Sequence, residues 1–163
     1  MFQDPEKELP DTGGNAGERA DSSRVVLLPA GSQFFGIPVA SVREVIPARI
    51  ATPLPGAAEC VRGLINLRGT IVTVFSLSGL LRLSESDSAA EKSIVLVEHG
   101  ERVVGLETER AVRILRVPSH EAEAPGDVRM IRDPDKVAAG EGREWCDVYT
   151  MLNIDDLLTP QFH

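Results

Sequence analysis

Residues that could carry out catalysis are scattered along this 163-residue sequence and form no recognisable constellation. The histidines are His99, His120 and His163, and no H-x-x-x-H spacing joins any two of them. His99 lies in a predicted turn and His163 ends the chain, positions where histidines are usually solvated. The two cysteines, Cys60 and Cys146, lie far apart and match no metal or redox motif. The sequence therefore gives little support for a metal site or a disulfide framework.

Motifs of nucleotide-binding loops and of nucleophilic serines do not occur in the sequence. There is neither a G-x-G-x-x-G nor a G-x-x-x-x-G-K-[ST] loop, and there is no G-x-S-x-G elbow. Carboxylates are paired at Asp133/Asp135 and at Asp155/Asp156, but the chain has 25 acidic residues and both pairs lie in polar surroundings. We interpret the first pair as part of a turn and the second as the start of a helix. Acidic side chains at a helix start are stabilised by the positive end of the helix dipole. We expect a non-enzymatic protein without a cofactor.

Residues 63–69, G-L-I-N-L-R-G, admit both a structural and a functional interpretation. In the structural one they form a turn between two strands, where Asn66 hydrogen-bonds the backbone and Arg68 is solvated. In the functional one, Gly63 and Gly69 hold a turn that aims Arg68 at a partner. Arginine suits this role because its guanidinium pairs bidentately with carboxylates and is enriched at binding hot spots. The residues alone leave both interpretations open.

Composition narrows the fold class and the possible partners. Hydrophobic residues make up 42% and charged residues 26%, as in ordinary globular domains, but aromatic residues make up only 4%. Val, Ile and Leu must therefore fill the core, which favours β structure. The net charge of −8 makes nucleic acid a poor partner, because an acidic surface releases no counterions from a polyanion. The apolar runs are far shorter than the roughly 20 residues that span a bilayer. We expect no membrane insertion, no secretory signal and a cytosolic setting.

The sequence contains an internal duplication. Residues 25–37 align with residues 94–106 at an offset of 69, and each segment has a glycine between two apolar stretches. This pattern predicts a β-hairpin in both places. Residues 69–81 align with residues 146–158 at an offset of 77, and each reads as a strand that runs into a short helical turn. The larger second offset predicts eight extra residues in the second connection, within residues 121–144.

Short strands separated by Gly and Pro predict an all-β barrel or sandwich. Each half, at roughly 60–70 residues, would have a marginal core, so we expect the two halves to share one. In the second helical turn, Asn153 or Asp155 could cap the helix by accepting a backbone N–H. Residues 1–23 are charged, contain Pro and Gly and lack apolar periodicity, so we predict a disordered acidic tail, with order beginning near Arg24.

Residues 61–72, V-R-G-L-I-N-L-R-G-T-I-V, closely resemble the signature stretch of CheW-like chemotaxis coupling proteins, which is centred on N-L-R-G. Further stretches agree in the same order, at residues 35–39, 42–46, 50–57, 102–106 and 152–158. The resemblance covers about residues 24–159 and leaves 160–163 as a C-terminal tail. It implies a single all-β domain of two pseudo-symmetric, SH3-like five-stranded barrels that share a hydrophobic core, with short helical turns.

The resemblance also implies a function. CheW-like proteins are non-catalytic adaptors that join the cytoplasmic tip of methyl-accepting chemoreceptors to the regulatory domain of a CheA-type histidine kinase. Such a protein is cytoplasmic and reaches membrane-anchored receptor arrays through protein contacts. Apolar side chains around Val42 would dock a receptor helix while Arg68 pairs with a carboxylate. The implied receptor-binding residues are Val42, Glu44 and Arg68, and the loop-shaping residues are Gly63, Asn66 and Gly69.

The sequence departs from the family pattern at a few positions. The family usually continues R-G-x-x-x-P-V-x-D-L, whereas this chain has Thr73 for the proline and Ser76 for the aspartate, and Glu109 stands where Asp is common. We expect Ser76 to weaken a local hydrogen-bond arrangement. An alternative function is a small β-barrel module that binds an anionic small ligand in the groove between the two halves, with Asn66 and Arg68 as its polar groups.

Overall fold

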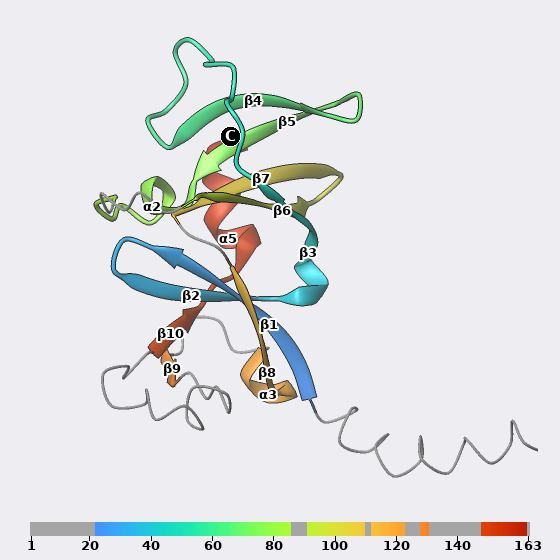
Figure 1. Cartoon of the computed structure of the whole chain (residues 1–163), viewed down its shortest axis with the longest axis vertical. Helices are drawn as coiled ribbons and strands as arrows, with labels where there is room; N and C mark the ends of the chain where they lie inside the picture. Colours follow the sequence, from blue (N-terminus) through green and yellow to red (C-terminus); the bar gives the residue numbers. More distant parts are fainter. Residues whose placement is uncertain (1–21, 86–90, 110–111, 123–127, 131–147, 163) are drawn as a thin grey trace, which may run out of the picture.

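The computed structural model describes residues 22–85, 91–109, 112–122, 128–130 and 148–162, and most of these residues form strands (Figure 1). The strands are β1 (Ser22–Ala30), β2 (Gln33–Pro38), β3 (Val42–Pro47), β4 (Val61–Leu67), β5 (Thr70–Ser76), β6 (Ser93–His99), β7 (Arg102–Thr108), β8 (Arg113–Pro118), β9 (Val128–Met130) and β10 (Val148–Met151). The short helices are η1 (Val39–Ser41), α2 (Leu77–Leu80), α3 (Ser119–Ala122), α5 (Ile154–Leu158) and η2 (Thr159–Phe162).

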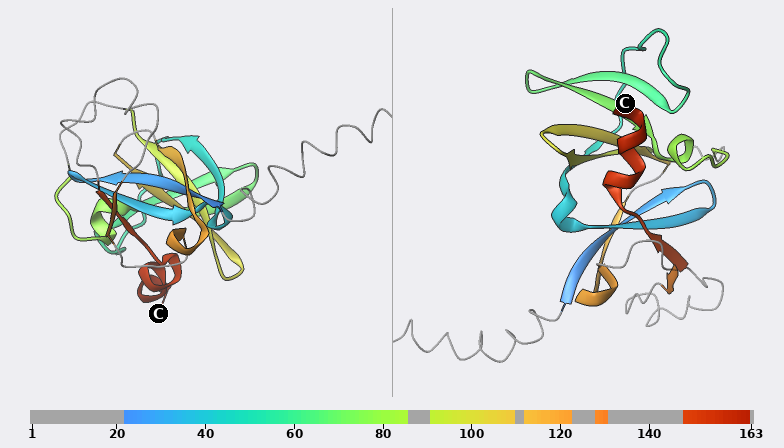
Figure 2. Two further views of the ribbon diagram at one scale, coloured as in Figure 1. Left: turned by 90° about the horizontal axis from the view of Figure 1, so that it is seen from below. Right: turned by 180° about the vertical axis from the view of Figure 1, so that it is seen from behind.

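The strands form two five-stranded sheets, which confirms the predicted all-β fold with two halves. The first sheet has the order β8-β1-β2-β10-β9 and the second has the order β3-β6-β7-β5-β4. Figure 1 shows the second sheet above the first, and the view from behind in Figure 2 shows the C-terminal segment with α5, in red, running beside both. Among the described residues, no helix has the length and apolar character needed to cross a bilayer.

The register of the strands confirms the duplication and adds an exchange that the alignment does not predict. Hairpin β1–β2 belongs to the first copy, yet it pairs with β10 of the second copy. Hairpin β6–β7 of the second copy pairs in the same way with β5 of the first. Thr73 lies opposite Val104 and Thr150 lies opposite Phe35, in parallel pairs related by the two offsets found in the sequence. Each sheet therefore combines a hairpin from one copy with a closing strand from the other.

Strands β3 and β8 are a further equivalent pair. Val45 of β3 lies opposite Val95, and Ile114 of β8 lies opposite Val26, so both strands extend their sheets beside the first strand of a hairpin. Both are antiparallel to that strand and follow the same register. The pseudo-symmetry thus gives each sheet an equivalent strand at its edge.

One apolar cluster lies between the sheets, which confirms the shared core. Each hairpin sends alternate side chains into it, and the short helices complete it. Its buried members are Val26, Leu28, Ala30, Phe35, Ile37, Phe75, Leu77, Val95, Val97, Val104, Leu106, Ile154 and Leu158. The opposite face of each sheet lines a smaller cluster of its own, one around Leu27 and Tyr149 and the other around Ile65 and Leu96.

The chain ends differ from the prediction where structure is described. Of the predicted disordered tail, residues 1–21 lie outside the described residues, but Ser22 and Ser23 already belong to β1 because they pair with Pro118 and Val117. The predicted C-terminal tail instead contains η2. This segment is ordered because the ring of Phe162 packs edge-on against Phe75, with ring centroids 5.9 Å apart. Most of residues 121–144, where the insertion is predicted, lie outside the described residues.

The predicted cap of the last helical turn is Asn153. Its Oδ1 accepts hydrogen bonds from the backbone N–H groups of Asp155 and Asp156, at 3.0 and 3.2 Å. Asp155 and Asp156 lie in the first turn of α5, as predicted. Both acidic side chains therefore face the positive end of the short helix dipole.

Candidate functional site

Arg68 lies at the tip of the hairpin that joins β4 to β5. Leu67 pairs with Thr70, so Arg68 and Gly69 form a two-residue loop. Their φ angles are +50° and +88°, and positive φ at both positions defines a type I′ turn. The Oδ1 atom of Asn66 accepts a hydrogen bond of 2.8 Å from the backbone N–H of Gly69. The tight turn and this bond hold the backbone of Arg68 in a fixed orientation.

Gly63 lies within β4, not in the turn, and it permits a close approach of two backbone segments. The backbone of Thr52 exchanges two hydrogen bonds of 2.8 Å with Leu64, which joins the segment after β3 to β4. Gly63 has φ +137° and marks a register shift in β4. A Cβ atom at this position would overlap the carbonyl of Thr52 and lie 3.2 Å from the Cβ of Ala51. Glycine at this position lets the second sheet close on itself.

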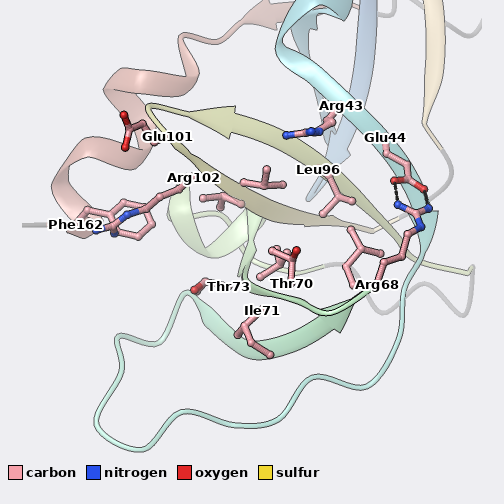
Figure 3. A pocket seen from close by; sticks show the side chains of 14 residues that line it. Arg43, Glu44, Arg68, Thr70, Ile71, Thr73, Leu96, Glu101, Arg102 and Phe162 are labelled. Carbon is pink, nitrogen blue, oxygen red and sulfur yellow. Dashed lines mark hydrogen bonds and ion pairs between the residues drawn. The ribbon is translucent and has the colours of Figure 1, made fainter.

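This closure brings Glu44 of β3 against Arg68. The guanidinium of Arg68 donates two hydrogen bonds to the Glu44 carboxylate, at 2.8 and 2.5 Å (Figure 3). The hydrogen bond from Arg68 lowers the pKa of Glu44 below its ordinary value, and the same bond raises the pKa of Arg68. The Arg68 side chain is 70% exposed and that of Glu44 is 30% exposed. The pair is therefore a bidentate ion pair whose arginine faces solvent.

Val42 is placed differently from the other two residues of the predicted receptor-binding set. It is half-buried, packs against the central core cluster and is not among the described residues that line the cleft beside Arg68. A bulge separates Val42 from Glu44 in the pairing of β3 with β6. The exposed apolar residue of β3 is Val45, which is 41% exposed. The structure therefore brings Glu44 and Arg68 together but turns Val42 towards the core.

A cleft of about 580 Å³ lies beside Arg68, where two hairpins diverge. Strands β5 and β7 pair only from Thr73 and Val104 onward, and their preceding residues separate towards the two turns. The described residues that line the cleft are Arg43, Glu44, Leu67, Arg68, Thr70, Ile71, Val72, Thr73, Leu96, Glu101, Arg102, Val103, Val104 and Phe162 (Figure 3). The cleft therefore lies at the second sheet and not between the two sheets, and residues of both sequence copies line it.

The C-terminal segment forms one wall of this cleft and was not predicted from the sequence. The guanidinium carbon of Arg102 lies 4.8 Å from the centre of the Phe162 ring, and the His99 ring stacks on the same ring at 5.6 Å. His99 Nδ1 also lies 2.9 Å from a carboxylate oxygen of Asp155. The expectation that His99 is solvated is wrong, because Phe162 and Asp155 cover it and leave its side chain only 17% exposed.

The departures from the family pattern have local explanations. Ser76 caps α2, since its Oγ accepts a 3.1 Å hydrogen bond from the N–H of Gly79, and the hydroxyl donates to Glu85 at 3.2 Å. Ser76 thus makes two local hydrogen bonds of its own, and the expected weakening stays a prediction. Glu109 is buried and accepts a hydrogen bond of 2.9 Å from the Ser78 hydroxyl. Thr73 lies in the sheet between β4 and β7.

These features suit recognition of another protein. A tight turn fixes an arginine at the surface, a carboxylate of the same chain orients it, and apolar residues of two hairpins lie beside it. A planar guanidinium held in this way can still donate from its remaining N–H groups to a carboxylate of a partner. The fold is a double β-barrel, and its second sheet holds Arg68 at the surface beside a cleft.

Residues 24–161 match the family model of the CheW-like domain. Because this match covers most of the sequence, the chain belongs to the CheW-like domain family. The family consists of scaffold proteins of chemotaxis that are generally non-enzymatic.

Individual relatives agree with this assignment. The chain is 29% identical to the chemotaxis protein CheW of Rhizobium meliloti over 104 residues, which cover 64% of this chain and 67% of the relative. It is 20% identical to the chemotaxis protein CheW of Helicobacter pylori over 152 residues, which cover 91% of each chain. The fold is similar to that of the scaffolding protein TtCheW from Thermoanaerobacter tengcongensis, with a TM-score of 0.67, 16% identity and coverage of 83% of this chain and 87% of that one.

Proposed function

We propose that this chain is a non-enzymatic adaptor that couples chemoreceptors to a CheA-type histidine kinase in a chemosensory array. Its partners are the cytoplasmic tip of methyl-accepting chemoreceptors and the regulatory domain of the kinase. It acts in the cytoplasm and is held at receptor arrays through these protein contacts. Membership of the CheW-like family supports the proposal, as does the arginine that the β4–β5 turn fixes at the surface.

The receptor surface in this proposal comprises β3 and the Arg68 turn. Glu44 uses both carboxylate oxygens to orient Arg68, and the guanidinium keeps further N–H donors for an acidic side chain of the receptor. Val45 supplies the exposed apolar contact on β3, while Val42 supports that strand from the core side. Asn66, Gly63 and Gly69 act indirectly, since they fix the turn and close the sheet behind it.

The cleft gives less support to the alternative of an anionic small ligand. Of the arginines that line it, Arg68 is already paired with Glu44, and Arg43 lies 3.4 Å from Glu98. Arg102 lies over the ring of Phe162. A small anion would therefore compete with interactions that each arginine already makes, whereas a protein partner can add contacts over a wider surface.

Receptor binding by charge variants tests the role of Arg68. We expect Arg68→Ala to weaken binding to the receptor tip and Arg68→Glu to weaken it further, measured by calorimetry with the purified cytoplasmic fragment. The exchange Glu44→Arg with Arg68→Glu is the matched control, because it retains an ion pair but reverses its direction. If Arg68 contacts the receptor, this exchange leaves binding weak.

Two results would contradict the proposal at different levels. Full recovery of binding by the exchanged pair would show that the ion pair only supports the fold, so Arg68 would not be a contact residue. If the wild-type chain binds neither the receptor fragment nor the kinase, the adaptor function itself is wrong. Unchanged folding of each variant is checked by circular dichroism before binding is measured.

A further inference from the structure

The edge of the first sheet carries a small surface with two opposed arginines and an exposed apolar residue beside them. We call it the β8 patch and define it by Arg24, Ile114 and Arg116. In β8, exposed and buried residues alternate: Ile114 and Arg116 are exposed, and Leu115 between them is buried. Ile114 is 58% exposed, which makes it one of the most exposed large apolar residues in the described part of the chain. Arg24 of β1 is exposed and lies directly opposite Arg116.

Two arginines directly opposite each other across antiparallel strands do not stabilise the fold. Like charges at such positions repel, because their Cβ atoms are only about 5 Å apart. Neither Arg24 nor Arg116 forms an ion pair with any residue that the structure describes. The chain has 25 acidic residues and a net charge of −8, so an acidic neighbour would be the common case. The pair therefore has an energetic cost that nothing in the described structure offsets.

The pseudo-symmetry gives this surface a counterpart. Strand β8 occupies in the first sheet the position that β3 occupies in the second, and Ile114 corresponds to Val45. Both strands thus present an exposed apolar residue at an equivalent point beside the central core. Their charges differ, however, because Pro47 of β3 lies opposite Ser93 at the place where Arg116 lies opposite Arg24. The two edge strands therefore present an apolar residue at the same point, but only β8 has an arginine pair beside it.

We propose that the β8 patch is a second docking surface, whose occupant is an acidic helix of a partner protein. This helix carries an apolar residue that covers Ile114 and two carboxylates one turn apart that pair with Arg24 and Arg116. The geometry fits because residues three or four apart on a helix have Cβ atoms about 5–6 Å apart, close to the spacing of the arginine pair. Each guanidinium can then bind one carboxylate, and the repulsion between the arginines becomes attraction to the partner.

The inference rests on the adaptor function, because it assigns a further surface to the same assembly. Binding of the full chain to the receptor cytoplasmic fragment and to the kinase is measured for Arg24→Glu and for Arg116→Glu. The matched control is Arg82→Glu, which makes the same charge change at an exposed arginine in the turn after α2. We expect each β8-patch variant to bind one of the two partners about tenfold more weakly, with a smaller difference at high salt. Arg82→Glu should bind as the wild type does.

The thermal stability of the variants is a second measurement, and for Arg116→Glu we expect stability to rise while partner binding falls. Arg116→Glu places a carboxylate opposite Arg24 and turns a repulsive pair into an attractive one. We expect its Tm to rise by roughly 1–4 °C relative to Arg82→Glu. A substitution that damages the fold would lower both stability and binding, whereas a docking residue loses binding while the protein becomes more stable.

The outcomes separate this inference from the adaptor function. If the wild type binds its partners and both β8-patch variants bind equally well, the inference is wrong and the adaptor function stands. If the wild type binds neither partner, both proposals are wrong. The alternative occupant that the test distinguishes is the acidic segment before Ser22. Deletion of residues 1–21 would then strengthen partner binding in the wild type but not in Arg116→Glu, and this result would overturn the assignment to a partner helix.

Discussion

Substitution of Gly63 tests whether the closure of the second sheet depends on a residue without a side chain. In the structure, a Cβ atom at this position would overlap the carbonyl of Thr52, and φ is +137°, an angle that L-amino acids rarely adopt. Gly63→Ala must therefore move the Thr52 segment away from β4 or change the backbone of β4. Either movement breaks the paired hydrogen bonds between Thr52 and Leu64.

The size of the effect follows from these two contributions. The backbone strain at a positive φ costs about 1–3 kcal/mol. Loss of the two hydrogen bonds costs about 0.5–1.5 kcal/mol each. We expect Gly63→Ala to lower the free energy of unfolding by about 2–6 kcal/mol, a large share of the about 5–15 kcal/mol typical of a domain. For a domain of this size, that loss corresponds to a fall in Tm of about 5–15 °C.

Urea unfolding measures the loss, and Gly56→Ala provides a matched control. Gly56 also has a positive φ, of +79°, but no atom lies within 4 Å of a Cβ built on it. Its substitution adds strain without a clash, so we expect a cost of about 1 kcal/mol. The difference between the two variants reports the contact with Thr52 together with the extra strain of φ +137° over φ +79°. Equal losses for Gly63→Ala and Gly56→Ala would refute the close-approach argument.

Two further predictions concern the ion pair and the C-terminal segment. Arg68→Ala should raise the pKa of Glu44 towards its ordinary value in a carboxyl NMR titration, because the hydrogen bond from Arg68 is its largest perturbation. Since the folded-state pKa of Glu44 is lowered, the stability that it contributes is present above the unfolded-state pKa and is lost as pH falls through the folded-state value. A pKa unaffected by Arg68→Ala would contradict the pairing. Phe162→Ala should lower the free energy of unfolding by about 1.5–3 kcal/mol, because the ring packs on Phe75 and under Arg102. Urea unfolding beside the control Gln161→Ala measures this loss, and equal values for the two variants would count against it.

Much of the fold could be predicted because the duplication repeats the same apolar pattern. The offsets of 69 and 77 align the residues that the structure places at equivalent points of its two sheets. The exchange of β5 and β10 between the sheets could not be predicted in this way. Apolar strands have similar side chains, so their composition does not reveal whether a closing strand pairs with the hairpin of its own copy or of the other. That choice depends on parallel pairing between distant segments.

In the site, too, some features follow from neighbouring residues in the sequence, whereas others depend on contacts between residues far apart in it. The type I′ turn follows from residues 66–69 alone, because Gly69 and Asn66 favour it locally. The contact between Arg68 and Glu44 needs the whole sheet, since β3 and β4 lie at opposite ends of its strand order and a bridge from Thr52, after β3, to Leu64 of β4 brings these ends together. The position of Phe162 could not be predicted for the same reason. Its partners lie in β5 and near the β6–β7 turn, and no local pattern links them to the last residues of the chain.

The exchange of strands has a consequence for how such an adaptor could work. Each hairpin needs a closing strand from the other copy, so neither copy can complete its sheet alone. The two sheets also share one buried cluster, and closely packed interiors resist gradual deformation. The edge strands β3 and β8 are therefore held at a fixed distance and orientation. Partners that dock on Val45 and on Ile114 would be positioned by the rigid body between them, so coupling would depend on the geometry of the two docking surfaces and would require no internal hinge.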